Sequence, residues 1–442
     1  MDHGRPESHH QDEDLREAQR QHLFPCVTTY YREPLVIARA SGRTVIDAEG
    51  REYLDFFGGI LTVSLGHCQP EVVSRVQEQV ARLGHTSTLY VTEPQINVAR
   101  MLSEIAPGDA LTRCFFTNSG SEAVETAVMT ARLHTGRHDV IALRHGYSGR
   151  TTLTTSLNGQ APWRPLGGSA TGIHHAASPY PYRCPLDTGD VQACEDYFIR
   201  DLQDVIETVT NGKPAAFLAE TIQGVGGFIV PPPGYFRRAA ELIRSHGGLF
   251  ICDEVQAGFG RTGSRWFGIE HWGVEPDIMV MAKGIANGFP VGATITTRAI
   301  ASSWTGKTLS TFGGNPISMA AAEATIETMR REDTPSRSAI RGAQLRSGLD
   351  ALAAEFPWIG EVRGMGLMQA LEIVEDPKTK KPGTARATAL MEAAREEGLL
   401  VGLGGLHGHI IRIGPPMLIT EAEVASGLER LAAACRKADK VA

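Results

Sequence analysis

Apolar and polar positions alternate along the middle of the chain in a pattern typical of an α/β protein. Between about residues 70 and 325, stretches with helical periodicity are separated by short, continuous apolar runs. Such runs are typical of strands buried on both faces of a mainly parallel sheet. The candidate strands are RCFFTNS, DVIALRH, AAFLAE, GGLFICDE, DIMVMA and GATITT. We therefore predict an α/β fold in which helices cover both sides of a large, mainly parallel sheet.

The two ends of the chain follow different patterns. Residues 1–20 are polar and charged without apolar periodicity, which predicts a disordered or loosely docked arm. The stretch 35–59 alternates β-branched runs with Ser-Gly and Glu-Gly turns, which predicts a small antiparallel meander. A long helical segment near residue 325 leads into a pattern that favours a smaller α+β unit. We divide the chain into an N-terminal part (1–68), a large domain (69–325) and a small C-terminal domain (326–442).

Composition and charge exclude several classes of protein. The 442 residues carry a net charge of -7, which provides no electrostatic footprint for nucleic acid or an anionic membrane surface. No apolar run reaches about 18 residues and the acidic N-terminus is unlike a presequence, so we expect a cytoplasmic protein. The seven cysteines are an odd count without a CxxC pair. We therefore expect reduced, mostly buried thiols, no disulfide framework and no metal site.

Lysine is scarce, and one lysine has an unusual position. The chain has eight lysines, and seven of them lie in polar or charged surroundings. Lys283 instead follows the apolar run DIMVMA and precedes a glycine-rich loop. Burial would lower the pKa of its side chain and leave a neutral amine that can form a Schiff base. Lys283 is therefore the main candidate for lysine chemistry.

Two further motifs place polar groups at the ends of predicted strands. In TNSGSEA, Ser119 and Glu122 form a capping-box pattern at the start of a helix, where backbone N–H groups can bind a phosphate. Asp253 follows the run GGLFIC at the carboxyl end of a strand, where open α/β sheets bind ligands. Each motif also has a purely structural interpretation: a capped helix for the first and a helix-capping aspartate for the second. Together with Lys283, however, they supply what pyridoxal phosphate needs: a phosphate anchor, an acid for the pyridine nitrogen and an imine-forming amine.

Four motifs, in this order and spacing, carry a resemblance to a known family. TNSGSEA, DEVQAGFGRTG, PDIMVMAKGIANGFPVGA and STFGGNP resemble the class III (omega-type) aminotransferases of the type I pyridoxal phosphate fold. The resemblance covers the chain from about residue 22. The stretches YYREPL, YLDFFGGILTVSLGHCQPE, HTSTL and LLVGLG are most similar to the alanine:glyoxylate aminotransferase branch. The resemblance implies a seven-stranded sheet in the large domain and a small domain built from the N- and C-terminal segments.

The resemblance also implies a role for individual residues around the cofactor. Lys283 would form the Schiff base and move the proton in the reaction, and Asp253 would hold the pyridine nitrogen. The remaining cofactor contacts would come from Ser119, Gly120 and Ser121 at the phosphate, Gln256 at the ring hydroxyl, Val255 below the ring, Tyr147 on the ring face and Thr311 at the phosphate of a neighbouring subunit. Considered without the family, Tyr147 would be interpreted as a core residue and Thr311 as a turn residue.

Substrate contacts are implied at Arg412, Ile60, Glu220 and Val225. Arg412 would grip a substrate carboxylate bidentately, although by itself it could be an ion-paired surface arginine. Val225 stands where ornithine and γ-aminobutyrate enzymes resemble each other in having a glutamate that can neutralise the carboxylate-binding arginine. Because Val225 is not an acid, Arg412 should stay available for an α-carboxylate. Ile60 replaces a glutamine of the similar dialkylglycine decarboxylases, which disfavours decarboxylation. Ser148 and Thr221 depart from the usual histidine and proline, and we expect them to reshape the pocket.

The expected function is a pyridoxal phosphate-dependent aminotransferase that forms a homodimer or tetramer with shared active sites. It would move an amino group from an alanine-like amino acid or an omega-amine to a 2-oxo acid such as glyoxylate or pyruvate, in two half-reactions. One alternative is a pyridoxal phosphate lyase, a decarboxylase or phospho-lyase, of the same subgroup. A second alternative is a phosphate- or nucleotide-binding module without lysine chemistry.

Overall fold

A seven-stranded, mainly parallel sheet forms the centre of the molecule. The computed structural model describes residues 8–440, and the sheet has the strand order β4-β10-β9-β8-β7-β5-β6. Its strands are β4 (Leu111–Thr117), β5 (Val140–Leu143), β6 (Ile173–Ala176), β7 (Ala216–Glu220), β8 (Leu249–Asp253), β9 (Ile278–Met281) and β10 (Gly292–Thr297). The strands from β6 to β9 are parallel, and β10 runs antiparallel to both β9 and β4. This arrangement confirms the predicted α/β fold and the strand predicted from each of the six apolar runs.

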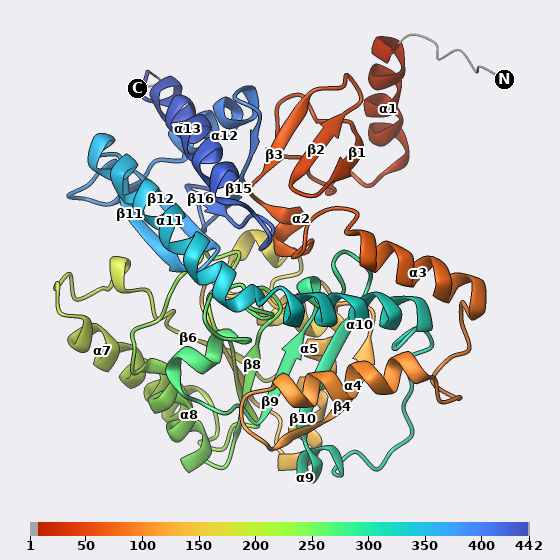
Figure 1. Cartoon of the computed structure of the whole chain (residues 1–442). Coiled ribbons are helices and arrows are strands. Elements are labelled where there is room, and N and C mark those ends of the chain that lie inside the picture. The colour runs from red at the N-terminus through yellow and green to blue at the C-terminus, as the bar shows by residue number, and fades with distance from the viewer. Residues whose placement is uncertain (1–7, 441–442) are drawn as a thin grey trace.

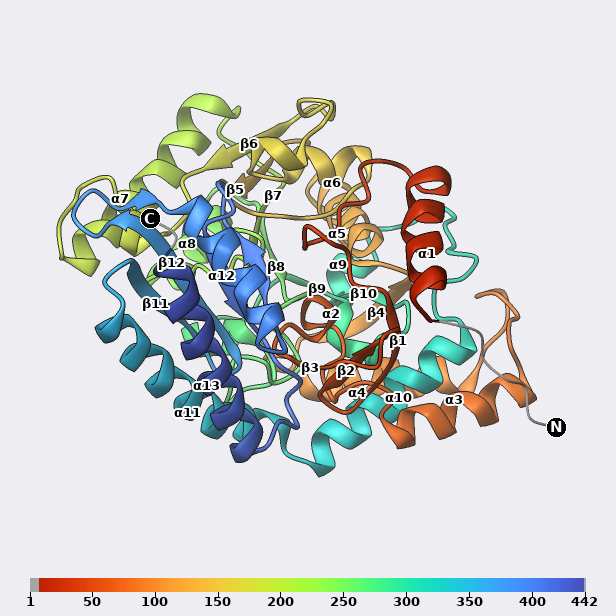
Figure 2. The same ribbon diagram turned by 90° about the horizontal axis from the view of Figure 1, so that it is seen from above.

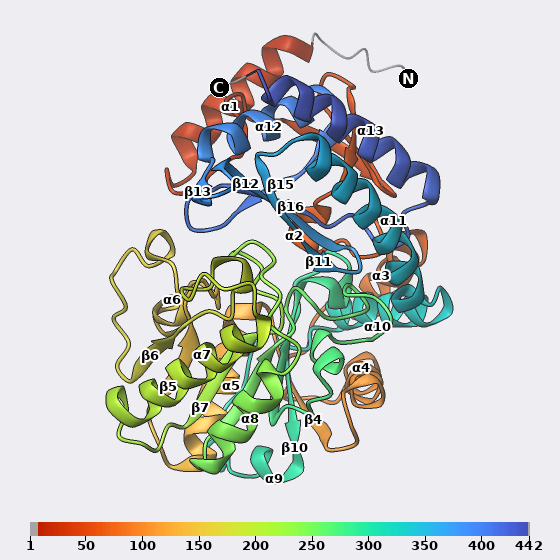
Figure 3. The same ribbon diagram turned by 90° about the vertical axis from the view of Figure 1, so that its left-hand side faces the viewer.

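Helices cover both faces of this sheet, and the alternation of side chains along β8 shows how. Ile251 packs in a cluster with α5 (Gly120–Thr135), whereas its neighbours Phe250 and Cys252 pack in a second cluster with α8 (Tyr235–Ser245). Successive residues of a strand point to opposite faces, so the two helices lie on opposite sides of the sheet. Figure 1 and Figure 3 show these layers. The other helices around the sheet are α3 (Pro70–Arg82), α4 (Glu93–Ile105), α6 (Thr152–Leu157), α7 (Val191–Asp204), α9 (Arg298–Ala301) and α10 (Pro316–Arg331).

Two smaller sheets, built from the ends of the chain, lie against one end of the large sheet (Figure 3). The first has the order β1-β2-β3-β14, and its members are β1 (Ile37–Ser41), β2 (Thr44–Asp47), β3 (Glu52–Asp55) and β14 (Leu399–Leu400). The second contains β11 (Ile359–Met365), β12 (Met368–Asp376), β13 (Lys381–Pro382), β15 (Gly402–Gly404) and β16 (Ile410–Ile413). Helices α11 (Thr334–Glu355), α12 (Thr384–Glu396) and α13 (Glu421–Ala438) complete this part. The meander predicted for 35–59 is confirmed, and β14 extends it in parallel with β3.

The structure corrects two expectations about local structure. The predicted arm is a helix from residue 8 onwards, α1 (Ser8–His22), and Arg16 holds it by donating from Nε to the Pro34 carbonyl at 2.9 Å. Figure 2 shows α1 at the edge of the molecule, beside β1. Residues 1–7 of the predicted arm lie outside the described residues.

Strand β6 was not predicted, because it lies within a stretch rich in glycine and proline. The three-part division of the chain stays a prediction, and its boundary at 325 falls inside α10.

The expectation of reduced thiols is wrong for one pair of cysteines. Cys184 and Cys194 form a disulfide that closes the loop before α7. Spacing alone could not identify this pair, because bonding depends on how the loop folds back onto the helix. Of the remaining cysteines, Cys252 and Cys435 are buried. Across the described part of the chain, no helix combines the length and the apolar character needed to cross a membrane.

Candidate active site

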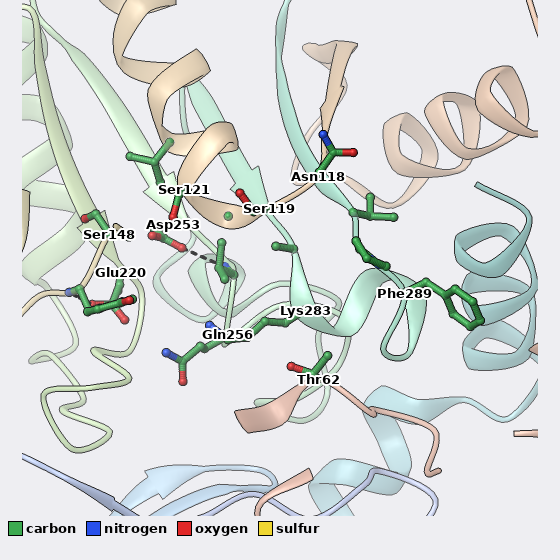
Figure 4. Close-up of a pocket in the computed structure, with 18 of the residues that line it drawn as sticks. Thr62, Asn118, Ser119, Ser121, Ser148, Glu220, Asp253, Gln256, Lys283 and Phe289 are labelled. Atoms are coloured by element: carbon green, nitrogen blue, oxygen red, sulfur yellow. Dashed lines mark hydrogen bonds between the residues drawn. The ribbon is translucent and has the colours of Figure 1, made fainter. Parts of the chain in front are cut away.

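A cavity of about 290 Å³ opens at the carboxyl ends of the parallel strands. Figure 4 shows side chains from several elements directed around this space. Nine of the predicted site residues line it: Ser119, Gly120, Ser121, Tyr147, Glu220, Asp253, Val255, Gln256 and Lys283. Open α/β sheets bind their ligands at this edge, because the loops after successive parallel strands meet there. The cavity is therefore the candidate active site.

Strand register brings two acids and one amine together in the cavity. Glu220 ends β7 and pairs with Asp253 at the end of β8, and Asp253 in turn pairs with Val280 of β9. Lys283 follows three residues later, with a left-handed backbone (φ 44°) at the start of the short helix η5 (Lys283–Ala286). Left-handed backbone is rare for a side chain of this kind and is typically maintained at functional sites. The turn directs Lys283 towards the two carboxylates instead of continuing the strand.

The Lys283 amine and the Asp253 carboxylate change each other's pKa electrostatically. Burial lowers the pKa of Lys283, and Arg412 lowers it further, whereas the carboxylates of Asp253 and Glu220 raise it. Burial raises the pKa of Asp253 to about 6, against the opposing effects of the Val255 N–H and of Lys283. Asp253 Oδ1 accepts a hydrogen bond from Val255 N at 2.9 Å. The Asp253 carboxylate is therefore already oriented by the backbone to contact a positive group in the cavity.

Glu220 connects the sheet to two loops that border the cavity. Its Oε1 accepts a hydrogen bond from Tyr147 N at 2.8 Å, and its Oε2 accepts one from Gly224 N at 2.7 Å. Burial, together with the neighbouring Asp253 carboxylate, raises the pKa of Glu220 to about 8. Glu220 thus fixes both the loop that presents Tyr147 and the loop that begins at Gly224.

Glu220 should make the stability of the cofactor-free protein fall as the pH rises. Its folded-state pKa of about 8 lies above its ordinary value of 4.5, so between these values the folded state binds more protons than the unfolded state. The free energy of unfolding then decreases with increasing pH in this window. Asp253 and Glu254 contribute in the same direction, but only up to their pKa values of about 6 and 7. We expect this contribution of Glu220 to lower the melting temperature between about pH 7 and 8, whereas the lowered pKa of Lys283 acts in the opposite direction.

Differential scanning calorimetry of the cofactor-free protein across this pH range measures the effect. The variant Glu220→Gln has no titrating group at this position, so its melting temperature should fall less steeply between about pH 7 and 8. Equal slopes for the variant and the wild-type protein would mean that Glu220 is already ionised in the folded state.

The first turn of α5 offers free donors for an anion. Ser119 is the N-cap of the helix, and its Oγ accepts a hydrogen bond from Glu122 N at 3.3 Å, as the capping-box pattern predicted. Within the described chain, the backbone N–H groups of Gly120 and Ser121 donate to no protein acceptor. A Cβ at Gly120 would lie 3.4 Å from the Val255 side chain, so a larger residue would crowd the cavity floor. Free N–H groups at a positive helix end favour a phosphate.

Three other residues line the cavity: Gln256 offers a polar contact, and Val255 and Tyr147 offer apolar surface. The Oε1 atom of Gln256 is buried without a hydrogen-bond partner in the described structure. Val255 lies between the Asp253 turn and Gly120, and its side chain faces the cavity. The Tyr147 ring is half-buried and packs edge-on against Trp163, with ring centroids 5.3 Å apart. An unpaired buried acceptor costs free energy unless a ligand satisfies it, so Gln256 indicates a bound donor.

Four predicted site residues do not line this cavity. Thr311 is exposed and lines a separate hollow of about 470 Å³ on the outer side of α5. Ile60 is 45% exposed in the turn α2 (Gly58–Leu61), with a left-handed backbone that is strained for a β-branched residue. Val225 and Arg412 lie together beyond Gly224, because Arg412 Nη1 donates to the Gly224 carbonyl at 3.3 Å. The structure therefore places Arg412 next to the cavity without making it part of the wall.

Arg412 is buried, and its side chain forms no ion pair with any residue between 8 and 440. Its Nε donates to the Leu403 carbonyl at 3.0 Å, and its Nη2 donates to the Tyr30 hydroxyl at 3.4 Å. The guanidinium lies over the rings of Phe57 and Phe228, at 4.9 and 5.7 Å from the ring centroids. No carboxylate in the part of the chain that the structure describes lies within ion-pair distance of Arg412. Two of its five N–H groups therefore remain available to a ligand.

Sequence reasoning missed the aromatic residues that surround Arg412. Tyr30 lies 382 residues away in the chain, and the hydrophobic pattern gives no sign that it approaches β16. Phe57 and Phe228 also come from separate segments, and Phe228 has a left-handed backbone (φ 54°) that turns its loop under the guanidinium. The available signals were two stretches that resemble the family, because YYREPL contains Tyr30 and YLDFFGGILTVSLGHCQPE contains Phe57.

The two departures from the family pattern have different positions. Ser148 lines the cavity, and its backbone N–H donates to Asn158 Oδ1 at 2.7 Å. Thr221 is fully buried and does not line the cavity, so an effect of Thr221 on the pocket would have to be indirect and stays a prediction. Its hydroxyl instead donates to Glu254 Oε1 at 2.6 Å, and Glu254 also accepts from the backbone N–H groups of Gly268 and Ile269. Thr221 thus holds a structural carboxylate behind the site.

The donor set of the cavity fits pyridoxal phosphate. The free N–H groups at the start of α5 suit the phosphate, and the oriented Asp253 carboxylate suits the pyridine nitrogen. The unpaired Oε1 of Gln256 suits the ring hydroxyl, and the Lys283 amine has the lowered pKa that covalent attachment to a carbonyl requires. Each group thus matches one part of the cofactor.

Comparison with known proteins gives the same answer. Residues 28–435 match the family model of class-III aminotransferases. A mitochondrial alanine–glyoxylate aminotransferase 2 homologue of Arabidopsis thaliana is 42% identical over 403 residues, covering 91% of this chain and 83% of that protein. Human mitochondrial alanine–glyoxylate aminotransferase 2 is 37% identical over 433 residues, covering 93% and 84%.

Solved structures agree with these relatives. An amine transaminase from an uncultivated Pseudomonas species, crystallised with pyridoxal phosphate bound, has a TM-score of 0.88 to this structure at 34% identity. The match covers 94% of this chain and 98% of that one. The sheet order, the cavity and the relatives all agree with the resemblance found in the motifs. The chain therefore belongs to the class-III aminotransferases and is a pyridoxal phosphate-dependent transaminase.

Proposed function

We propose that Lys283 binds pyridoxal phosphate covalently and that the cavity residues hold it in one orientation. Ser119, Gly120 and Ser121 would bind the phosphate through the first turn of α5, and Asp253 would keep the pyridine nitrogen protonated. The remaining contacts would be Gln256 at the ring hydroxyl, Val255 below the ring and Tyr147 on its other face. When bound, pyridoxal phosphate supplies an electron sink and stores the amino group between the two half-reactions.

The protein side of the reaction is a proton transfer at the substrate α-carbon. Lys283 Nζ would take this proton, because burial lowers its pKa and favours the neutral amine. Its left-handed backbone projects the amine into the cavity beside Asp253 and Glu220. Arg412 lies close enough to lower the pKa of Lys283, so a carboxylate bound there would place its α-carbon near Nζ.

We further propose that the donors are α-amino acids such as alanine and that the acceptors are 2-oxo acids such as glyoxylate or pyruvate. The observation that carries this proposal is the unpaired guanidinium of Arg412, which is buried between two aromatic rings. A buried arginine favours a planar carboxylate because its fork of N–H groups matches the two oxygens. Val225 offers no acid to neutralise it, and relatives named alanine–glyoxylate aminotransferase support the same choice.

The absorption spectrum of the purified holoenzyme tests this function. Adding L-alanine without any keto acid should bleach the yellow cofactor band, and later addition of glyoxylate or pyruvate should restore it. L-Ornithine provides a comparison substrate, because ornithine enzymes resemble each other in having a glutamate where this chain has Val225. The pocket of this chain therefore has no acid at position 225 to meet the second amino group of ornithine. A band that responds to omega-amines but not to L-alanine would contradict an α-amino acid donor.

We also propose a homodimer, or a tetramer built from dimers, in which Thr311 reaches the phosphate site of a neighbouring subunit. Thr311 is exposed and stands outside the cavity of its own chain, in a hollow that also contains Asn118. Leu89 and Leu309, each more than half exposed, line an adjacent hollow, and such apolar surface is typical of interfaces. A holoenzyme that sediments with the 47.7 kDa of a single chain would contradict this assembly.

The cellular location stays a prediction. We propose the cytoplasm, the location expected above, whereas the Arabidopsis and human relatives are named mitochondrial. Microscopy of the protein in its own cells would decide between these compartments.

A further inference from the structure

Two buried arginines stand in register on β11 and β16, the two strands that flank β12 in the C-terminal sheet. Arg363 of β11 pairs with Ala370 of β12, and Ala370 pairs with Arg412 of β16. Residues opposite each other in a sheet share a face, so both arginines project to the same side. Ala370 lies between them, is fully buried and has only a methyl group as its side chain. With neighbouring strands about 4.8 Å apart, the backbones of the two arginines lie about 10 Å from each other.

Both arginines bind carbonyl groups of the same loop. Arg412 Nη1 donates to the Gly224 carbonyl at 3.3 Å, and Arg363 Nε donates to the Gly227 carbonyl at 2.9 Å. The loop is closed at its base, because Gln223 and Ile229 exchange backbone hydrogen bonds. We call residues 224–228 the carboxylate loop, since it carries the Phe228 ring below Arg412 and is fixed at its start by Glu220. Arg363 is thus the anchor at the far end of this loop.

Close packing holds the carboxylate loop against Arg363. Gly227 has a left-handed backbone (φ 105°), and a Cβ there would lie 2.2 Å from Ile410 Cδ1 and 3.1 Å from Arg363 Nη2. The backbone therefore approaches β16 and Arg363 as closely as a glycine allows. Any movement of the Arg363 side chain would be transmitted to Gly227, and from there to Phe228.

Arg363 pairs with two carboxylates, and neither of them pairs with Arg412 in the described structure. Arg363 Nη1 pairs with Glu372 at 2.6 Å and with Glu361 at 2.5 Å. Glu372 is also bound by Arg183 Nε at 2.6 Å and by the hydroxyl of Tyr180. Glu372 stands two residues from Ala370 on the same face, so it is a diagonal neighbour of Arg412. Arg363 thus pairs with the carboxylate that is diagonal to Arg412 in the sheet, and Arg412 remains unpaired in the described structure.

We propose that Arg363 is a positioning residue that makes the site selective for carboxylate substrates. Its guanidinium anchors the carboxylate loop through Gly227 and holds Glu372 away from Arg412, so that the Arg412 guanidinium stays oriented and free. This inference rests on the proposed role of Arg412 as the carboxylate-binding residue. Glutamine in place of Arg363 cannot bind a carbonyl and two carboxylates at once, because it lacks the fork of donors and the charge.

The test compares Arg363→Gln with Arg183→Gln in the holoenzyme. Both variants remove one positive charge from the Glu372 cluster, but Arg183 makes no hydrogen bond to the carboxylate loop in the described structure. Steady-state kinetics give KM and kcat for L-alanine. Calorimetric titration with propanoate, which is alanine without its amino group, gives Kd for a carboxylate without any turnover. Arg363→Lys serves as a second variant that keeps the charge and one donor to Gly227 if the glutamine variant does not fold.

For Arg363→Gln we expect KM for L-alanine and Kd for propanoate to rise together by about tenfold or more, with kcat changed by less than about threefold. Arg183→Gln should change both constants by less than about threefold, and Arg363→Lys should give an intermediate rise. An unchanged Kd for propanoate in Arg363→Gln would overturn the inference. Equal rises in Arg363→Gln and Arg183→Gln would also overturn it, because the cluster as a whole would then be responsible.

Failure of the proposed function has a different signature. A wild-type holoenzyme that binds propanoate but does not react with L-alanine would refute the alanine donor while leaving Arg363 testable through Kd. A wild-type holoenzyme that binds no propanoate would refute the role of Arg412 itself, and the inference with it.

Discussion

Lys283→Ala is expected to abolish transamination. If Lys283 has the proposed role, the variant loses both the covalent attachment of the cofactor and the base at the substrate α-carbon. General acid–base catalysis by one side chain contributes about 100- to 10,000-fold, so kcat should fall by more than about 1,000-fold. Lys283 is the one lysine at the cavity among residues 8–440, so no other lysine of the same chain can replace it. Single-turnover assays with L-alanine and glyoxylate measure the loss.

Lys213→Ala is the matched control, because Lys213 is exposed far from the cavity in the loop before β7. It should leave kcat, the cofactor band and the melting temperature unchanged. Borohydride reduction of the wild-type holoenzyme should label a peptide that contains Lys283, and the alanine variant should carry no label. Substantial turnover by Lys283→Ala, or a label at another lysine, would refute the assignment of Lys283.

Asp253→Asn is the second substitution with a large expected effect. Asparagine keeps the shape of the side chain and its Oδ1 can still accept from Val255 N, but it cannot hold a proton on the pyridine nitrogen by charge. Removing one electrostatic group that stabilises charge in a transition state typically costs about 100- to 1,000-fold in kcat. We expect a loss of that size, together with a shift of the cofactor band. Stopped-flow spectroscopy of the half-reaction with L-alanine measures both.

The stability of the cofactor-free protein separates this role from a structural one. Burial raises the pKa of Asp253 to about 6, so above this pH its charge opposes folding, and the neutral asparagine should keep or raise the melting temperature. Glu254→Gln is the matched comparison on the next residue. Glu254 is fully buried and accepts hydrogen bonds from Thr221, Gly268 and Ile269 without lining the cavity. It should lose about 1–3 kcal/mol of stability with little effect on the cofactor band.

An opposite pattern would contradict this division of roles. If Asp253→Asn unfolded the protein while Glu254→Gln shifted the cofactor band, the carboxylate facing the pyridine nitrogen would be Glu254. The direction of the two side chains makes this outcome unexpected, because successive residues at the end of β8 point to opposite sides.

The core of the site could be predicted because its residues follow directly from local patterns. Lys283 and Asp253 each end an apolar run, and Ser119 begins a helix after one. The carboxyl ends of parallel strands meet at one edge of a sheet, so the strand predictions alone bring these three residues together. The motifs then added the roles of Gln256, Val255 and Tyr147 by resemblance.

The surroundings of Arg412 could not be predicted in this way. Tyr30, Phe57 and Phe228 come from three separate segments, and no periodicity in the chain relates them to β16. The disulfide between Cys184 and Cys194 was likewise missed, because an odd cysteine count without a CxxC pair carries no information on pairing. Helix α1 was missed because its polar sequence has no apolar stripe of the kind that marks a helix packed on a core.

The sequence by itself determined the α/β sheet, the helix turn proposed to bind phosphate, and the positions of Asp253 and Lys283 at the ends of strands, since each depends on a few consecutive residues whose pattern is set by strand or helix geometry. Only the tertiary structure decided that Glu220 stands beside Asp253, that Arg412 stays unpaired between two aromatic rings, and that Arg363 anchors the loop next to it. These contacts depend on strand register and on segments hundreds of residues apart. Burial and pKa shifts arise from that packing, and no local pattern encodes them.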